Sequence, residues 1–198
     1  MSSLTLYYWG IRARGQIPVL VARYGDLPLE WNRAPDWPGM KDQTVLGQLP
    51  FLVDGDVKVS QSGAISRYLA RKANLLGNTD ADYAISQMLV EEQVDLFNII
   101  GKANSAENKE EAYTKAFAEE FPAHLARVQS LLGESEFFTS QVTVGTLAIF
   151  SVLNLALDLE SSVLDQTPAL KAFYERVAAL PAIKAYLEEN IPPYFSRK

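Results

Sequence analysis

The chain has 198 residues, of which 48% are hydrophobic and 21% are charged, a balance typical of a globular protein with a sizeable buried core. Its formal net charge of −6 argues against a nucleic-acid partner, because phosphate binding needs a concentrated basic face. The sequence contains no cysteine, which excludes disulfides, thiolate metal sites and a cysteine nucleophile. Any sulfur chemistry would therefore use a thiol supplied by another molecule. We also find no spacing typical of metal ligands.

No segment has the pattern of a targeting signal or a membrane span. The first residues lack a basic stretch followed by a long apolar run. The most apolar later stretch, residues 147–157, is too short to cross a bilayer. We therefore expect a cytoplasmic protein with no membrane partner.

The first third of the chain has the pattern of a small α/β unit. Apolar residues alternate from Leu4 to Tyr8, which predicts a short strand. Helical spacing of apolar residues predicts a helix over residues 16–24, and residues 29–31 predict a second strand. A polar loop at residues 33–47 follows.

Residues 48–72 then predict a β-hairpin followed by a helix. The apolar runs 51–53 and 57–59 flank an Asp54-Gly55 pair, which favours a two-residue hairpin turn. Gln61 and Ser62 come directly before residues with helical apolar spacing. A helix that opens at a serine favours anion binding, because its first N–H groups have no partner within the helix.

The sequence patterns after a turn-rich segment at residues 77–82 predict only helices. Amphipathic patterns cover residues 83–102 and 113–132. Residues 143–157 are apolar on every side, which predicts a buried central helix capped by Thr143. Pro168 and Pro181 each open a further helix. The fold class is therefore α/β followed by all-α.

Three motifs together resemble the cytosolic glutathione transferase family over essentially the whole chain. Residues 8–15 (YWGIRARG) look like the tyrosine-type signature of that family, sigma-like with mu-like features, and the Leu49-Pro50 and Gln61-Ser62 pairs follow at family spacing. The resemblance implies a cis peptide bond before Pro50. It also implies a thioredoxin-like glutathione-binding domain (βαβ then ββα) at residues 1–76. A linker at residues 77–82 and a helical-bundle domain at residues 83–198 would follow.

The resemblance implies an enzyme that conjugates glutathione to hydrophobic electrophiles, as in detoxification, with no further cofactor and no metal. A free thiol has a pKa of about 8.5, so the site must stabilise the thiolate. Tyr8 falls on the catalytic tyrosine, and a hydrogen bond from its hydroxyl to the sulfur would lower the thiol pKa. Arg14 would add a permanent positive charge beside it.

The remaining site residues follow from the same resemblance. A carboxylate of the partner subunit would bind the glutathione amine, which requires a homodimer. The residues expected to bind glutathione are Trp37, Lys41, Gln48, Leu49, Pro50, Gln61, Ser62 and Asp95 of the partner subunit. Those expected to line the pocket for the second, apolar substrate are Ile11, Arg12, Asn98, Lys102 and Phe195.

Other functions of the same fold stay open on the sequence alone. They are a glutathione-dependent isomerase or peroxidase, a non-catalytic crystallin-like relative, and a carrier of hydrophobic ligands. The joint presence of Tyr8, Arg14, Gln61 and Ser62 favours the enzyme, because a structural protein needs none of them together.

Overall fold

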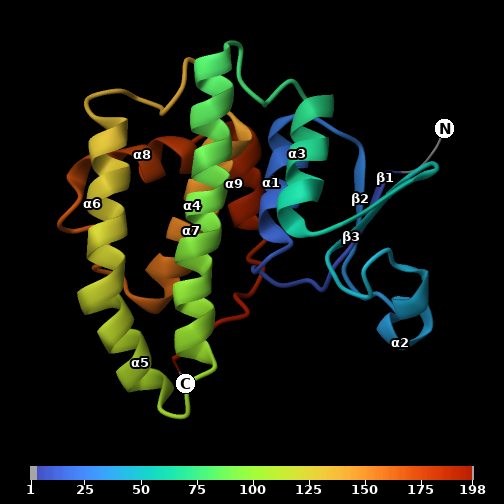
Figure 1. Ribbon diagram of the computed structural model, residues 1–198, viewed down its shortest axis with the longest axis horizontal. Helices are drawn as coiled ribbons and strands as arrows, with labels where there is room; N and C mark the ends of the chain where they lie inside the picture. Colours follow the sequence, from blue (N-terminus) through green and yellow to red (C-terminus); the bar gives the residue numbers. More distant parts are fainter. Residues whose placement is uncertain (1–3, 198) are drawn as a thin grey trace.

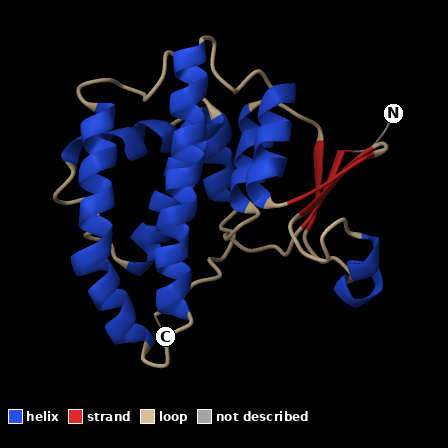
Figure 2. Cartoon of the chain, viewed as in Figure 1, coloured by secondary structure: helices blue, strands red, loops and turns tan. Residues whose placement is uncertain are grey.

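The computed structural model describes residues 4–197. The N-terminal part contains four strands in the order β2-β1-β3-β4, with helices between and after them in the chain (Figures 1 and 2). Its elements are β1 (Leu4–Tyr7), α1 (Gln16–Tyr24), β2 (Leu29–Asn32), α2 (Trp37–Met40), η1 (Lys41–Gln43), β3 (Phe51–Asp54), β4 (Val57–Ser60) and α3 (Ser62–Lys72).

The sheet is mixed. Strand β1 runs parallel to β2 and antiparallel to β3, and β3 is antiparallel to β4. Asp54 is paired with Val57, so the hairpin turn consists of Gly55 and Asp56, one residue later than the predicted Asp54-Gly55. Gly55 has a φ of 58°, a left-handed conformation that glycine adopts without steric cost.

The C-terminal part is all-helical. Its first helix, α4, begins at Asp80, within the segment 77–82 that was predicted as the linker. The helix begins there because Thr79 caps it: the Thr79 hydroxyl accepts a hydrogen bond from the Asp82 N–H at 3.1 Å. The helical elements are α4 (Asp80–Asn104), α5 (Lys109–Lys115), η2 (Ala116–Glu120), α6 (Phe121–Leu132), α7 (Val144–Leu159), α8 (Pro168–Ala178) and α9 (Pro181–Glu188).

The predicted helical stripe at residues 113–132 is interrupted by a π-helical turn, η2. Pro122, at the start of α6, has no N–H and cannot continue the regular hydrogen-bond ladder. A wider turn before the proline is one way in which the chain avoids that loss. Figure 1 shows α5 and α6 continuing one another along the edge of the molecule.

Helix α7 is buried along almost its whole length, as its apolar sequence predicts. Thr143 and Thr146 form a reciprocal cap, in which each hydroxyl accepts from the other residue's backbone N–H. Gly145 lets α7 approach α4 closely, because a Cβ there would stand 2.5 Å from the Ser86 carbonyl oxygen. Helix α7 also packs against α1 and α3, and so joins the two domains.

The predicted fold class is confirmed. An α/β domain with a four-stranded sheet is followed by an all-helical domain, and Figure 1 shows α1 and α3 between the sheet and the helices α4 and α7. Within residues 4–197, no helix is long and apolar enough to cross a membrane.

Candidate functional site

The strand register brings the separated motifs to one end of the sheet. Tyr7, the last residue of β1, is paired with Asn32 of β2 and with Phe51 of β3, and Phe51 is paired with Ser60 of β4. The residues just beyond these pairs therefore leave the sheet at the same end. They are Tyr8, the loop that leads to α2, the Leu49-Pro50 pair and the Gln61-Ser62 pair.

Tyr8 is held in place by hydrogen bonds of its backbone and by the burial of its side chain. Its N–H donates to the Asn32 carbonyl at 3.1 Å, and its own carbonyl accepts from the Trp31 indole at 2.9 Å. The side chain is buried, with the residue 6% exposed. This burial raises the pKa of the Tyr8 hydroxyl above its usual value, although the Arg14 N–H and the Arg14 charge oppose the shift. The hydroxyl therefore keeps its proton at neutral pH and can donate a hydrogen bond.

Arg14 brings a positive charge to the same place. Its guanidinium lies over the ring of Phe97 in α4, 4.6 Å from the ring centroid, a distance typical of a cation–π contact. The charge acts on the Tyr8 hydroxyl. Tyr8 and Arg14, predicted as the catalytic pair, therefore do lie together.

A cavity of about 220 Å³ opens beside this pair. Its walls come from the loop after β1, from α4 and from the C-terminal tail. Phe97 and Phe195 meet edge-on within it, with ring centroids 5.2 Å apart. The cavity has both polar and aromatic walls, so it suits a small molecule that carries an apolar group beside polar ones. The lining residues are Tyr8, Ala13, Arg14, Phe97, Gly101, Asn104, Ser105, Tyr194 and Phe195.

Of the residues predicted as walls for a second substrate, only Phe195 lines this cavity. Asn98 and Lys102 are exposed on α4, one residue away from Phe97 and Gly101, which do line it. One residue is a rotation of about 100° around a helix, enough to turn a side chain out of the cavity. Ile11 packs against the hydrophobic core instead.

Arg12 is also absent from the cavity walls, and its side chain points toward the helical domain. It lines a separate cavity together with residues of α7, of α9 and of the segment after α9. Its neighbour Arg14, two residues later, faces the cavity beside Tyr8. The two arginines of the signature thus lie on opposite sides of the loop.

Five residues that line this cavity were not named from the sequence: Phe97, Gly101, Asn104, Ser105 and Tyr194. In the sequence, Phe97 has the spacing of an ordinary core residue of an amphipathic helix. Gly101 carries a signal that could have found the cavity, because a glycine inside a long helix is unfavourable unless space is needed there. A Cβ on Gly101 would meet no atom within 4 Å, so the space beside this wall of the cavity is open.

The start of α3 has the geometry of an anion site. Gln61, the N-cap residue, has φ 75° and ψ 119°, and no side-chain hydrogen bond caps the helix. A non-glycine residue in that region is strained, and such strain gathers at ligand-binding positions. Ser62 follows as the first helical residue, half-buried. The predicted cis peptide bond between Leu49 and Pro50 is confirmed.

The other predicted glutathione residues are more scattered. Trp37 begins α2 and is half-buried, as is Gln48, whereas Lys41 is exposed at the start of η1. Figure 1 shows α2 at the end of the sheet where β1 terminates. Asp95 is exposed on α4. Within residues 4–197, no cluster of histidine and carboxylate side chains could hold a metal ion.

Comparison with known proteins identifies the family. Residues 4–71 match the glutathione S-transferase N-terminal domain, and residues 94–190 match the C-terminal domain. The chain is 32% identical to Glutathione S-transferase Mu 3 of Homo sapiens, over 96% of this chain and 89% of that protein. It is 28% identical to Hematopoietic prostaglandin D synthase of Gallus gallus, over 96% and 98%. The solved Pi-class glutathione S-transferase of Onchocerca volvulus superimposes with a TM-score of 0.88 and 29% identity, over 95% and 93%. The chain therefore belongs to the glutathione S-transferase family of enzymes, which use glutathione as co-substrate.

Proposed function

We propose that this enzyme conjugates the thiolate of glutathione to hydrophobic electrophiles and that Tyr8 stabilises the thiolate. The observation that carries the proposal is the buried, proton-bearing hydroxyl of Tyr8, which lies beside the Arg14 charge in the wall of a partly aromatic cavity. A hydroxyl that keeps its own proton can donate it in a hydrogen bond to an anion. It would favour the charged form of the sulfur and lower the pKa of the thiol.

The reaction then needs little more from the protein. The bound thiol releases its proton to solvent, and the thiolate attacks the electrophilic carbon, so that a carbon–sulfur bond forms. The electron pair leaves with a leaving group or moves along a polarised double bond. Arg14 would stabilise the developing negative charge, because its guanidinium stays protonated throughout. Phe97 and Phe195 would hold the apolar part of the electrophile.

Glutathione would lie along the end of the sheet where the motifs meet. We propose that Leu49 pairs with its backbone, next to Gln48 and Pro50. Ser62 and Gln61 would bind the γ-glutamyl carboxylate, since the first N–H groups of α3 are uncapped there. Trp37 and Lys41 would bind the glycyl carboxylate.

We further propose that the protein works as a homodimer. Asp95 lies on the exposed side of α4, at helical spacing from Met88 and Glu91, and Met88 is 50% exposed. Tyr83 on the same helix and Val57 on the edge strand β4 are also exposed apolar residues. We take these exposed apolar residues as the candidate contacts of an interface with a second copy. Asp95 of the partner subunit would then bind the glutathione amine.

A second candidate function is a glutathione-dependent isomerisation. It is favoured by the 28% identity to Hematopoietic prostaglandin D synthase, which covers nearly the full length of both chains. The aromatic cavity beside Tyr8 would suit an apolar, oxygenated substrate. We place either activity in the cytoplasm, where it would serve detoxification or lipid metabolism.

Replacement of Tyr8 tests the proposal directly. Tyr8→Phe removes one hydroxyl, and we expect conjugation of chlorodinitrobenzene to fall by about a hundredfold, the usual effect of losing one donor to an anion. Retention on immobilised glutathione should persist. Tyr7→Phe is the matched control, because Tyr7 is half-buried and stacks on Phe51. Unchanged turnover in Tyr8→Phe would remove Tyr8 from its role, and failure of the wild type to bind glutathione would overturn the function.

A further inference from the structure

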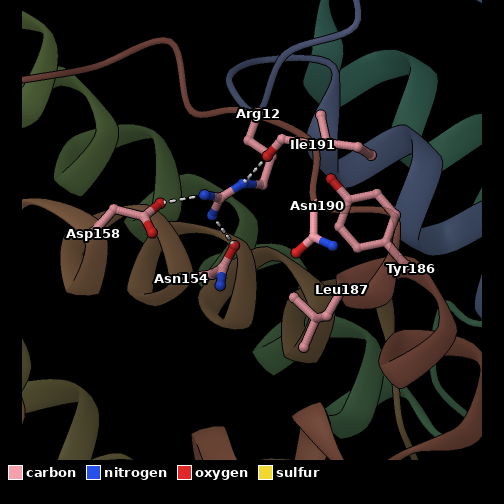
Figure 3. Close-up of a pocket in the computed structure, with 7 residues that line it drawn as sticks. All are labelled: Arg12, Asn154, Asp158, Tyr186, Leu187, Asn190 and Ile191. Atoms are coloured by element: carbon pink, nitrogen blue, oxygen red, sulfur yellow. Dashed lines mark hydrogen bonds and ion pairs between the residues drawn. The ribbon is translucent and has the colours of Figure 1, made fainter.

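Arg12 makes hydrogen bonds through all three of its guanidinium nitrogens (Figure 3). Nε donates to the Ile191 carbonyl at 2.8 Å, Nη1 donates to Asn154 Oδ1 at 2.6 Å, and Nη2 pairs with Asp158 Oδ2 at 2.6 Å. The side chain is 12% exposed. One residue of the N-terminal domain thereby contacts both α7 and the segment after α9.

The backbone of Arg12 is bound to the same tail. Its N–H donates to the Pro192 carbonyl at 2.8 Å, and its carbonyl accepts from the Tyr194 N–H at 3.1 Å. The tail therefore runs alongside the signature loop as a short parallel bridge. Tyr194 and Phe195 come directly after this bridge and form one wall of the cavity beside Tyr8.

We infer that Arg12 is a positioning residue, which fixes the shape of the second-substrate cavity by tying the signature loop and the C-terminal tail to α7. The inference rests on the proposed function. Arg12 itself lies outside that cavity. It acts through Arg14, two residues along the loop, and through Tyr194 and Phe195, whose course along the tail it sets.

The network around Arg12 is anchored from further helices. Asn154 Oδ1 also accepts from the Gln16 side chain of α1 at 3.0 Å, and Asn154 Nδ2 donates to the Tyr174 hydroxyl of α8 at 3.0 Å. Planar, multidentate contacts of this kind demand the fork of a guanidinium, and a lysine could satisfy only part of them. The position of Arg12 is therefore fixed more firmly than a surface ion pair would fix it.

Asp158 would be left in an unfavourable setting without Arg12. Burial already raises the pKa of the Asp158 carboxyl, although the Arg12 charge opposes the shift. Removal of the cation would leave a partly buried carboxylate without its partner, which is costlier than removing both groups. We therefore expect the loop and the tail to move when Arg12 alone is replaced, and to move less when both are replaced.

The glutathione positions are separate from this network. Leu49, Gln61 and Ser62 lie at the sheet end of the site, and Arg12 contacts none of them. An effect of Arg12 should therefore appear in the recognition of the apolar group and leave glutathione recognition intact. This separation distinguishes a positioning role from a general stabilisation of the fold.

The test compares the affinities of S-methylglutathione and S-hexylglutathione, measured by calorimetry, for the wild type and for Arg12→Met. The two ligands share their glutathione part, so the ratio of their affinities measures how well the cavity binds the longer alkyl group. The measurement does not require turnover. We expect Arg12→Met to lower the preference for the hexyl ligand about tenfold, equivalent to about two methylene groups losing contact. The affinity for S-methylglutathione should stay within about twofold of the wild type.

Further variants control for folding. Arg23→Met is the matched control, because Arg23 also joins the two domains, through Glu189 at 3.0 Å, but is 51% exposed and outside the cavity. It should leave the ratio unchanged. Arg12→Lys should resemble Arg12→Met, and the Arg12→Met/Asp158→Leu double variant should recover part of the ratio. If Arg12→Met does not fold, Asp158→Asn should lower the ratio in the same direction.

Two outcomes would overturn different claims. If the wild type prefers S-hexylglutathione and the folded Arg12→Met variant keeps that preference, Arg12 only joins the domains and the inference fails. If the wild type binds neither ligand, the proposed function fails.

Discussion

The ring of Tyr8 lies directly against Gly15, so closely that a Cβ on Gly15 would stand 2.2 Å from Tyr8 Cδ1. No side chain fits there without displacing the ring. Gly15 also contributes a backbone N–H that lowers the pKa of the Tyr8 hydroxyl, against the larger effect of burial. The position of the Tyr8 ring, at the start of the signature, therefore requires a residue without a side chain at Gly15, at its end.

Gly15→Ala should misplace Tyr8. We expect the variant to lose about 1–3 kcal/mol of stability through overpacking and at least about tenfold in kcat/KM. Thermal unfolding and steady-state kinetics measure the two effects. The control is Gly10→Ala in the same loop, because a Cβ there would stand 3.4 Å from Arg33 Cβ and should be tolerated. Equal activity of the two variants would contradict a fixed Tyr8.

Gly101 should set the size of the second substrate. Gly101→Ala places a methyl group in open space, and we expect it to stabilise α4 by about 0.5–1 kcal/mol with a small kinetic effect. Gly101→Leu should fill the cavity beside Phe97 and raise KM for bulky electrophiles more than for small ones. A series of electrophiles of increasing size measures this difference. A uniform change across the series would show that the second substrate binds elsewhere.

The contact between Asp82, at the start of α4, and Ser140, in the segment before α7, should weaken at acid pH. Its carboxylate accepts from the Ser140 hydroxyl at 2.7 Å and from the Ser140 N–H at 3.1 Å, and these bonds lower the pKa of Asp82. A lowered pKa in the folded state means that the stabilisation is complete above the unfolded value of about 3.9 and is lost as the pH falls through the folded-state pKa.

Asp82→Asn should therefore be less stable than the wild type at pH 7, and the difference should shrink as the pH falls below about 4. Urea unfolding at a series of pH values measures it. Asp80→Asn is the control, because Asp80 lies in the same first turn but is exposed. A difference that stays constant with pH would assign the effect to packing and not to charge.

Complementation between two inactive chains tests the proposed dimer. A Tyr8→Phe chain keeps Asp95, and an Asp95→Ala chain keeps Tyr8. If Asp95 acts on the site of the other subunit, a mixed dimer has one site with both residues intact and recovers about half of the wild-type activity. If Asp95 acts within its own chain, no site in the mixture is complete. Activity after co-expression, with mass measured by light scattering, decides between the two.

The sequence was enough to predict the parts of the fold that depend on local patterns. The hairpin of β3 and β4, the helix α1 and the buried helix α7 each have a periodicity or a cap that is visible over a few residues. The hairpin turn was predicted one residue too early, because the Asp54-Gly55 pair looks like the turn while Asp54 in fact pairs with Val57. The π-helical turn before Pro122 was not expected.

Within the candidate site, the sequence could predict only the proximity of residues that belong to one short motif. Tyr8 and Arg14 belong to one signature and do lie together beside the cavity. The cavity walls could not be predicted in the same way, because they depend on the rotation of α4 about its axis and on the path of the tail. Asn98 and Lys102 lie one helical position away from the residues of α4 that line the cavity, and Arg12 lines a separate cavity while its backbone pairs with the tail.

The ionisation of bound glutathione is the most direct test of the central claim, that Tyr8 stabilises the thiolate. It is followed as thiolate absorbance in an ultraviolet difference spectrum against pH. In the wild type we expect the thiol to ionise well below its free value of about 8.5. In Tyr8→Phe the midpoint should return toward that value while glutathione still binds. Equal midpoints in the two proteins would contradict the account.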